Sequence, residues 1–265
     1  MKIIKYKLML WFVPLLVISL VISISERCYA NDAPIRLIGG GAMPSSGFNQ
    51  TIKMETEEIT IRLEKKSYTV DATFHFLNTG ETKEEMVGFP KRGFGYWGDF
   101  KGTRPFLRFE TWVNGKKTQF SEEPESASVE GVLYLPDLIN AIKENTSDSL
   151  FVKDFRWLVK RVLFPSRKKT VTRVRYEAEY QESSNCLSAS YIYGTGNPWK
   201  DTIGRALFKV DTAAAPEKSI SVRFPVKAKY LVQEKQVSEN IREYQINNFD
   251  PEADDDVFIF VGLCP

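Results

Sequence analysis

Hydrophobic and polar residues alternate along much of this chain. Ile59, Ile61 and Leu63 are separated by single polar residues, and apolar residues again occupy every second position over 70–76. A period of two puts successive side chains on opposite faces of a strand, so these segments are predicted to be half-buried antiparallel strands. The same reasoning predicts strands over residues 85–89, 106–113, 171–180, 187–193, 205–210, 219–224, 241–246 and 257–261.

One turn is indicated by its dipeptide. Asn114-Gly115 follows the strand predicted over 106–113 and precedes a run that ends at Phe120. Both residues tolerate positive φ, which the tightest hairpin turns require. The sequence therefore predicts a hairpin at this point.

The middle of the chain has a different pattern. Leu135-Pro136-Asp137 predicts the start of a short helix, and a second helix is predicted over Phe151–Leu163, ended by Pro165. Its apolar residues fall at helical spacing, and Lys153, Arg156, Lys160 and Arg161 form its polar side. Such a basic amphipathic helix packs its apolar side on the protein or lies on an anionic membrane surface, and both interpretations are kept.

The order of elements predicts the fold class. Strands are followed by helices and then by strands again, without the β-α-β alternation of a parallel sheet. We therefore expect a mainly β protein, with two β-sandwich-like units joined by a short two-helix insert. The predicted divisions are a signal peptide (1–30), an N-terminal unit (31–130), the insert (131–166) and a C-terminal unit (167–265).

The N-terminus predicts export. Three lysines precede an apolar run that extends from Leu8 to about Ile24, and small residues occupy positions 28 and 30. This is the layout of a signal peptide cleaved after Ala30, although the run is also just long enough for an uncleaved membrane anchor. Cleavage would release a periplasmic or secreted protein. It also removes four basic residues and one acidic residue from a chain of net charge +2, which argues against a nucleic-acid partner.

Two cysteines lie beyond the signal segment, Cys186 and Cys264. An isolated pair in an oxidising compartment predicts one disulfide, which would tie down the C-terminal end of the chain. The alternative is two unpaired thiols.

Several motifs resemble those of a known family. Residues 52–90 contain Met54-Glu55, Glu57 and Ile59 in an acidic strand, then Phe76 and Asn78, then Phe89-Pro90. Similar patterns return in LFPSRKKTVTRVRYEAEY, YIYGTGNPWKDTIGRALFKVD and INNFDPEADDDVFIF. Together they resemble a family of secreted bacterial proteins of unknown function, although the second proline that the family shows after Phe-Pro is replaced here by Lys91-Arg92-Gly93. The resemblance implies export and a β architecture, and it carries over no catalytic residue.

Residue counts limit the available chemistry. His75 is the single histidine, so a histidine-based zinc site is excluded and a Ser-His-Asp triad would have to use this residue. Alternation places His75 on the polar face with Asp71 and Thr73, so an exposed, non-catalytic histidine is predicted. The acidic residues from Asp250 to Asp256 lack the pattern of a calcium loop, and a solvated turn is favoured over a cation site. No cofactor or metal is predicted.

An aromatic, glycine-rich stretch is the candidate binding surface. Glycines allow a tight loop, and aromatic rings stack on sugars or anchor a protein partner. The alternative is that these rings cap one end of a sandwich, and Trp199 has the same two interpretations with the structural one favoured. The candidate binding residues are Phe94, Tyr96, Trp97 and Phe100.

These observations favour a binding protein over an enzyme. Nucleophile, metal and phosphate-binding signatures are missing from the sequence, so we expect a non-catalytic binding or interaction module of the cell envelope, with a protein or glycan partner. The alternative is a carboxylate-dependent hydrolase that acts on an envelope or extracellular glycan, because carboxylates are plentiful although no spacing singles out a pair.

Overall fold

Every regular element in the described part of the chain is a β-strand. The structure is a computed structural model, and it describes residues 33–38, 41–44, 50–96, 106–124, 151–183, 186–193, 198–224, 231–251 and 256–262. The mainly β class predicted from alternation is confirmed. Within these ranges, no helix is long and apolar enough to cross a bilayer.

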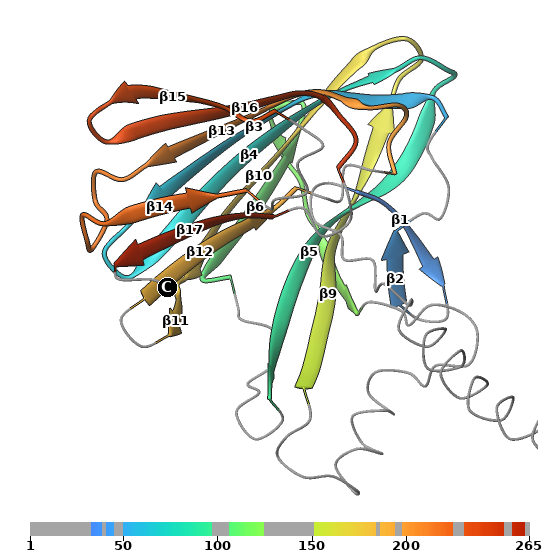
Figure 1. Cartoon of the computed structure of the whole chain (residues 1–265). Helices are drawn as coiled ribbons and strands as arrows, with labels where there is room; N and C mark the ends of the chain where they lie inside the picture. Colours follow the sequence, from blue (N-terminus) through green and yellow to red (C-terminus); the bar gives the residue numbers. More distant parts are fainter. Residues whose placement is uncertain are drawn as a thin grey trace, which may run out of the picture.

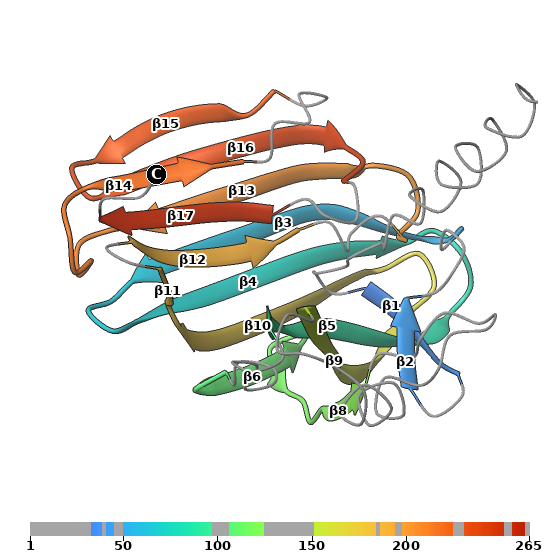
Figure 2. The ribbon, with the colours of Figure 1, turned by 60° about the horizontal axis from the view of Figure 1, so that its bottom comes forward.

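The largest sheet has eight strands in the order β15-β16-β13-β3-β4-β10-β6-β7. Figure 2 shows the run from β15 to β10 side by side. We call it the large sheet. Its strands are antiparallel except where β3 and β13 run parallel. Their bounds are Ile52–Leu63 (β3), Ser67–Asn78 (β4), Arg108–Val113 (β6), Lys116–Lys117 (β7), Lys169–Glu179 (β10), Ile203–Asp211 (β13), Gln233–Ser238 (β15) and Ile241–Phe249 (β16). Strands from both predicted units, 31–130 and 167–265, thus share one sheet.

Two further sheets lie on one face of the large sheet (Figure 1). The side sheet has five strands, ordered β2-β1-β5-β9-β8, and the small sheet has four, ordered β11-β12-β17-β14. The side sheet contains Ala33–Ile38 (β1), Gly41–Pro44 (β2), Lys83–Tyr96 (β5), Ser121–Pro124 (β8) and Phe151–Phe164 (β9). The small sheet contains Gln181–Ser183 (β11), Cys186–Ile192 (β12), Ile220–Arg223 (β14) and Asp256–Gly262 (β17).

Aromatic side chains fill the space between these layers. Phe74 and Phe76 point inward from β4, as alternation predicts, and neither is exposed to solvent. The Trp199 ring is also fully buried, and its centroid lies 4.8 Å from that of Phe76 and 5.8 Å from that of Phe164. The structural role favoured for Trp199 is therefore confirmed. Rings with offset or edge contacts at these distances add to the stabilisation from burial alone.

The predicted helix over Phe151–Leu163 is wrong, because this segment is strand β9. Leu158 and Val162 pack into the core, while Trp157 and Val159 join a second cluster on the other face of the side sheet. A strand buried on both faces loses the alternation that identifies strands, and its apolar run then resembles a helix. The predicted basic helix and its membrane contact are withdrawn with it. The shorter helix predicted near Leu135 lies outside the described residues.

The polar side assigned to that helix is not uniformly solvated. Lys160 is 3% exposed, and its Nζ donates a hydrogen bond to Oγ1 of Thr111 at 2.9 Å, which links the side sheet to β6. Arg161, one residue on, is exposed and pairs with Glu84 at 2.9 Å. Lys160 and Arg161 thus point to opposite faces of β9, one buried and one exposed, because successive side chains of a strand alternate between its faces.

Two backbone features fix local geometry. Asn114 and Gly115 have φ values of 47° and 78°, so the predicted hairpin between β6 and β7 is confirmed.

Glycine is required at position 204 because two strands approach each other closely there. A Cβ atom there would lie 2.5 Å from the carbonyl oxygen of Glu55, beside the register shift in β3. A side chain at position 204 would therefore push the parallel strands β3 and β13 apart.

Candidate functional site

The face of the large sheet opposite the core is the candidate site. Among the described elements, none covers it (Figure 1). Alternation along β4, β10 and β6 places a second set of side chains on this outer face. They are Asp71, Thr73 and His75 on β4, Val171, Arg173 and Arg175 on β10, and Arg108, Glu110 and Trp112 on β6.

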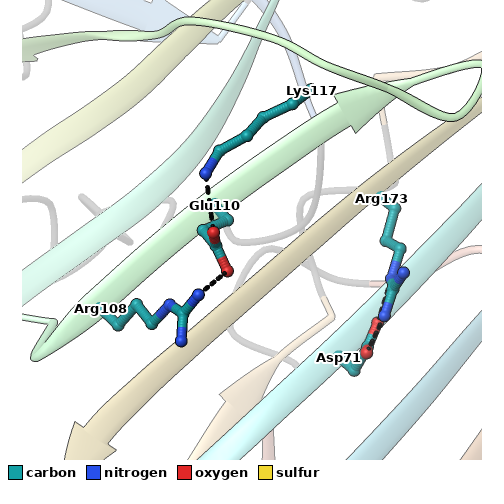
Figure 3. Close-up of polar contacts among 5 residues, drawn as sticks. All are labelled: Asp71, Arg108, Glu110, Lys117 and Arg173. Carbon is teal, nitrogen blue, oxygen red and sulfur yellow. Dashed lines mark hydrogen bonds and ion pairs between the residues drawn. The ribbon is translucent and has the colours of Figure 1, made fainter.

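Arg173 is the centre of this face. Its guanidinium forms a two-pronged ion pair with Asp71, in which Nε donates to Oδ1 at 2.7 Å and the second nitrogen binds Oδ2 (Figure 3). The same group lies 5.0 Å from the centre of the Trp112 ring, within the range of a cation–π contact. The hydrogen bonds that Arg173 donates to Asp71 raise the pKa of Arg173, which keeps it charged. Two neighbours thus hold this cation in one place.

Glu110 is held in a similar way on β6. Lys117 Nζ lies 2.7 Å from one of its oxygens, and Arg108 lies 3.0 Å from the other (Figure 3). The hydrogen bonds from Lys117 and then Arg108 lower the pKa of Glu110. A carboxyl with a lowered pKa is a poor general acid, because it carries no proton near neutral pH.

A shallow hollow opens beside these ion pairs, with a volume of about 190 Å³. It is lined by Thr73, Trp112, Gly115, Val171 and Arg173, and we call it the Trp112 hollow. The hollow forms because Thr73, Val171 and Gly115 are small, whereas Trp112 and Arg173 beside them are large. Nothing lies within 4 Å of the position of a Cβ at Gly115, so the hollow is open on the side of the turn.

The turn that borders the hollow is fastened to β10. The Asn114 side chain accepts a hydrogen bond from the Val171 amide at 2.9 Å, and the Asn114 amide donates to the Val171 carbonyl at 2.8 Å. These bonds hold the rim of the hollow in a fixed position. A binding surface with a fixed shape loses less conformational entropy when it takes a ligand.

His75 lies where its alternation predicts. It is half-buried between the buried Phe74 and Phe76, on the same face as Asp71 and Thr73. Its register partner on β10 is Val171, which places it next to the hollow. The outward orientation is therefore confirmed, but the side chain is half-buried rather than exposed.

The predicted aromatic loop has a different structure at its start. Phe94 and Tyr96 belong to strand β5, where they pair with Lys153 and Phe151 of β9. Trp97 and Phe100 lie outside the described residues, so the binding role of these four aromatics stays a prediction.

Trp112 was missed by the sequence analysis. The sequence did contain an indication of its role. In the alternating strand, Trp112 occupies the same set of positions as the polar residues Arg108 and Glu110, so its ring is expected on the outer face.

The predicted disulfide stays a prediction. Cys186 is buried at the start of β12, and its register partner on β17 is Gly262. Cys264 follows Gly262 by two residues and lies outside the described part. The antiparallel register therefore brings the chain close to Cys186 shortly before Cys264.

The described residues contain no group of three or more His, Cys, Asp and Glu side chains that could hold a metal ion. The acidic residues 252–255 lie outside the described part. On the outer face, Asp71 and Glu110 are both engaged in ion pairs. This arrangement suits the binding of a ligand better than proton transfer to one.

Two of the solved structures to which this chain is similar come from bacteria. A Legionella pneumophila protein, provisionally described as a nutrient binding protein, has a TM-score of 0.53 at 15% identity, over 88% of this chain and 71% of that protein. At this identity the likeness shows a shared fold alone. The M1 zinc metallopeptidase of Deinococcus radiodurans has a TM-score of 0.36 at 8% identity, over 83% of this chain and 44% of the enzyme. This likeness is too weak to indicate a shared fold or function. No family model and no curated protein matches the chain, so the family resemblance stays a prediction.

Proposed function

We propose that this chain is an exported, non-catalytic binding module of the cell envelope, and that it binds its ligand in the Trp112 hollow. The observation that carries the proposal is the hollow itself, in which an aromatic ring, a fixed cation and a hydroxyl meet on the outer face. Binding sites combine apolar and aromatic lining with a few well-placed polar groups in this way. A ligand-binding role is compatible with the description of the Legionella protein that shares the fold.

Export is part of the proposal because the N-terminal residues have the layout of a signal peptide. We expect the mature chain to begin at Asn31 and to be periplasmic or secreted. N-terminal sequencing of the protein from the exported fraction tests this expectation. A chain that keeps Met1 and stays with the membranes would contradict it.

The binding proposal is tested with a panel of soluble ligands: neutral glycans, uronic-acid glycans, amino acids and short peptides. Isothermal titration calorimetry measures the affinity of the purified protein for each. We expect at least one to bind, and Trp112→Ala to weaken that binding about tenfold or more, since tryptophan is enriched among the residues that contribute most to binding energy. Val171→Phe fills the hollow without removing an ion pair and should have a similar effect.

The matched control is Val237→Phe, the same change at an exposed position on the edge strand β15. It should leave the affinity unchanged. Binding that survives both Trp112→Ala and Val171→Phe would contradict the proposal. Because the two variants act by removing a ring and by adding one, a shared loss of binding in folded protein points to the hollow.

A further inference from the structure

The composition of the Trp112 hollow narrows the class of ligand. Trp112 and Val171 supply apolar surface, and Thr73 supplies a hydroxyl that donates and accepts hydrogen bonds. A sugar ring has the matching properties, because it presents C–H groups on its faces and hydroxyls around its edge. The indole ring is the largest apolar surface available to such a ring here.

The charges beside the hollow favour an acidic ligand. Asp71 engages two of the three guanidinium nitrogens of Arg173, and arginine has five N–H donors, so donors remain. Arg175 lies two residues along β10 and is exposed, and its register partners Asp71 and Glu110 are each paired with other cations. Lys117 and Arg108 add positive charge around Glu110. Arg175 is thus an exposed cation two residues from the hollow-lining Arg173, beside two carboxylates that other cations already pair.

The geometry of the face favours a polymer that lies across it. Outward residues two apart on a strand are separated by roughly 6.6 Å, so Arg173 and Arg175 present successive contacts along β10. The open side at Gly115 lets a chain leave the hollow without meeting a wall. A single sugar would use the hollow alone, whereas an acidic polymer also reaches Arg175.

The sheet itself argues against an extended peptide. Strand addition needs unpaired backbone groups at a sheet edge. β10 is an interior strand, paired with β4 on one side and β6 on the other. Its backbone groups are therefore engaged in the sheet, and the ligand must be recognised by side chains.

We infer that the ligand of the Trp112 hollow is an acidic glycan, with one sugar ring in the hollow and a carboxylate of the polymer at Arg175. The inference rests on the proposed function and specifies its ligand. Charge attraction on an exposed face is screened by salt, so the affinity should fall as ionic strength rises.

The test compares four soluble polymers by calorimetry with the purified protein. Polygalacturonate carries a carboxylate on each sugar, its methyl ester keeps the backbone without the charge, dextran is a neutral glycan, and polyphosphate is a polyanion without sugar rings. We expect polygalacturonate to bind, and we expect the affinities for the ester and for dextran to be lower by about tenfold or more. Polyphosphate should bind more weakly than polygalacturonate, and Trp112→Ala should not change its binding.

Variants locate the charge. Arg175→Gln should weaken polygalacturonate binding by up to about fivefold, the range of an exposed ion pair, and should leave ester binding unchanged. Lys235→Gln removes a cation from the exposed strand β15 and should change neither. Trp112→Ala and Val171→Phe should weaken polygalacturonate binding about tenfold or more, and circular dichroism checks that both variants are folded.

The outcomes separate the two proposals. If the ester binds as tightly as the acid and Trp112→Ala weakens both, the acidic ligand is wrong and the binding module stands. If polyphosphate binds as tightly as polygalacturonate and neither needs Trp112, the attraction is unspecific and the inference is overturned. If no polymer binds while another member of the ligand panel binds through Trp112, the ligand class is wrong. If nothing binds in either experiment, the proposed function fails as well.

Discussion

The two faces of the large sheet are built from the same strands and have opposite chemistry. On β4, Ala72, Phe74 and Phe76 are fully buried against the other sheets, whereas the residues that alternate with them, Asp71, Thr73 and His75, belong to the outer face. Removing an inner side chain opens a cavity, and the surrounding structure closes it only in part. Removing an outer side chain changes a surface that water already reaches. The comparison indicates that stability resides on one face, and that the other is available for binding.

The largest effect is expected from Phe76→Ala on the inner face. This ring contacts those of Phe74, Phe164 and Trp199, so its loss should lower the free energy of unfolding by ~3–5 kcal/mol. Urea unfolding measures the change. Leu77→Ala, one residue along and on the outer face, is the matched control, and a loss as large as that of Phe76→Ala would break the distinction between the faces.

A smaller effect is expected from the ionisation of Tyr180, which follows β10 and is buried. Its hydroxyl donates to the Glu64 carbonyl at 2.8 Å, and burial raises its pKa to about 12. The folded state thus favours the neutral phenol more than the unfolded state does, where the pKa is about 10. This stability is complete below about pH 10 and is lost as the pH rises to about 12, by roughly 3 kcal/mol in total.

Tyr180→Phe isolates this contribution. The other tyrosines are common to both chains, so the comparison removes their titration. Urea unfolding at several pH values should show that the chain with Tyr180 loses stability relative to Tyr180→Phe as the pH rises from about 10 to 12, by roughly 2–3 kcal/mol. A difference that stays constant over this range would show that Tyr180 does not titrate as the fold requires.

The smallest effect is expected from His75→Ala. His75 is half-buried on the outer face, and surface substitutions of this kind usually change the free energy of unfolding by less than about 0.5 kcal/mol. Thermal unfolding and the ligand panel check the result. A large loss of stability would place His75 in the core, and the loss of a measured reaction rate by ~10²–10⁴-fold would reveal a general base.

Strands with one buried face were predictable from alternation. Ile59, Ile61 and Leu63 point inward on β3, and the Asn114-Gly115 turn follows from its dipeptide. β9 was not predictable in this way because apolar residues occupy both of its faces. β15 was missed for the opposite reason. All its residues are exposed, so neither face of the strand carries a row of apolar residues. Alternation reports burial, and burial of both faces or of neither removes the signal.

The pairing of distant strands and the hollow could not be predicted from local pattern. The parallel contact of β3 with β13 joins residues far apart in sequence. The Trp112 hollow needs Thr73, Gly115 and Val171 from three separate parts of the chain, and the sequence does not state their register. Trp112 itself could have been suspected from its polar phase. Its position beside Arg173 required the structure.

Hydrogen–deuterium exchange tests most directly whether the outer face binds the ligand. The purified protein is compared with and without the glycan of the panel that binds it most tightly. We predict slower exchange confined to residues 71–75, 112–118 and 171–175, with the largest change in the exposed turn at Asn114-Gly115. Slower exchange in the β5–β9 pair or in the small sheet alone would contradict the account.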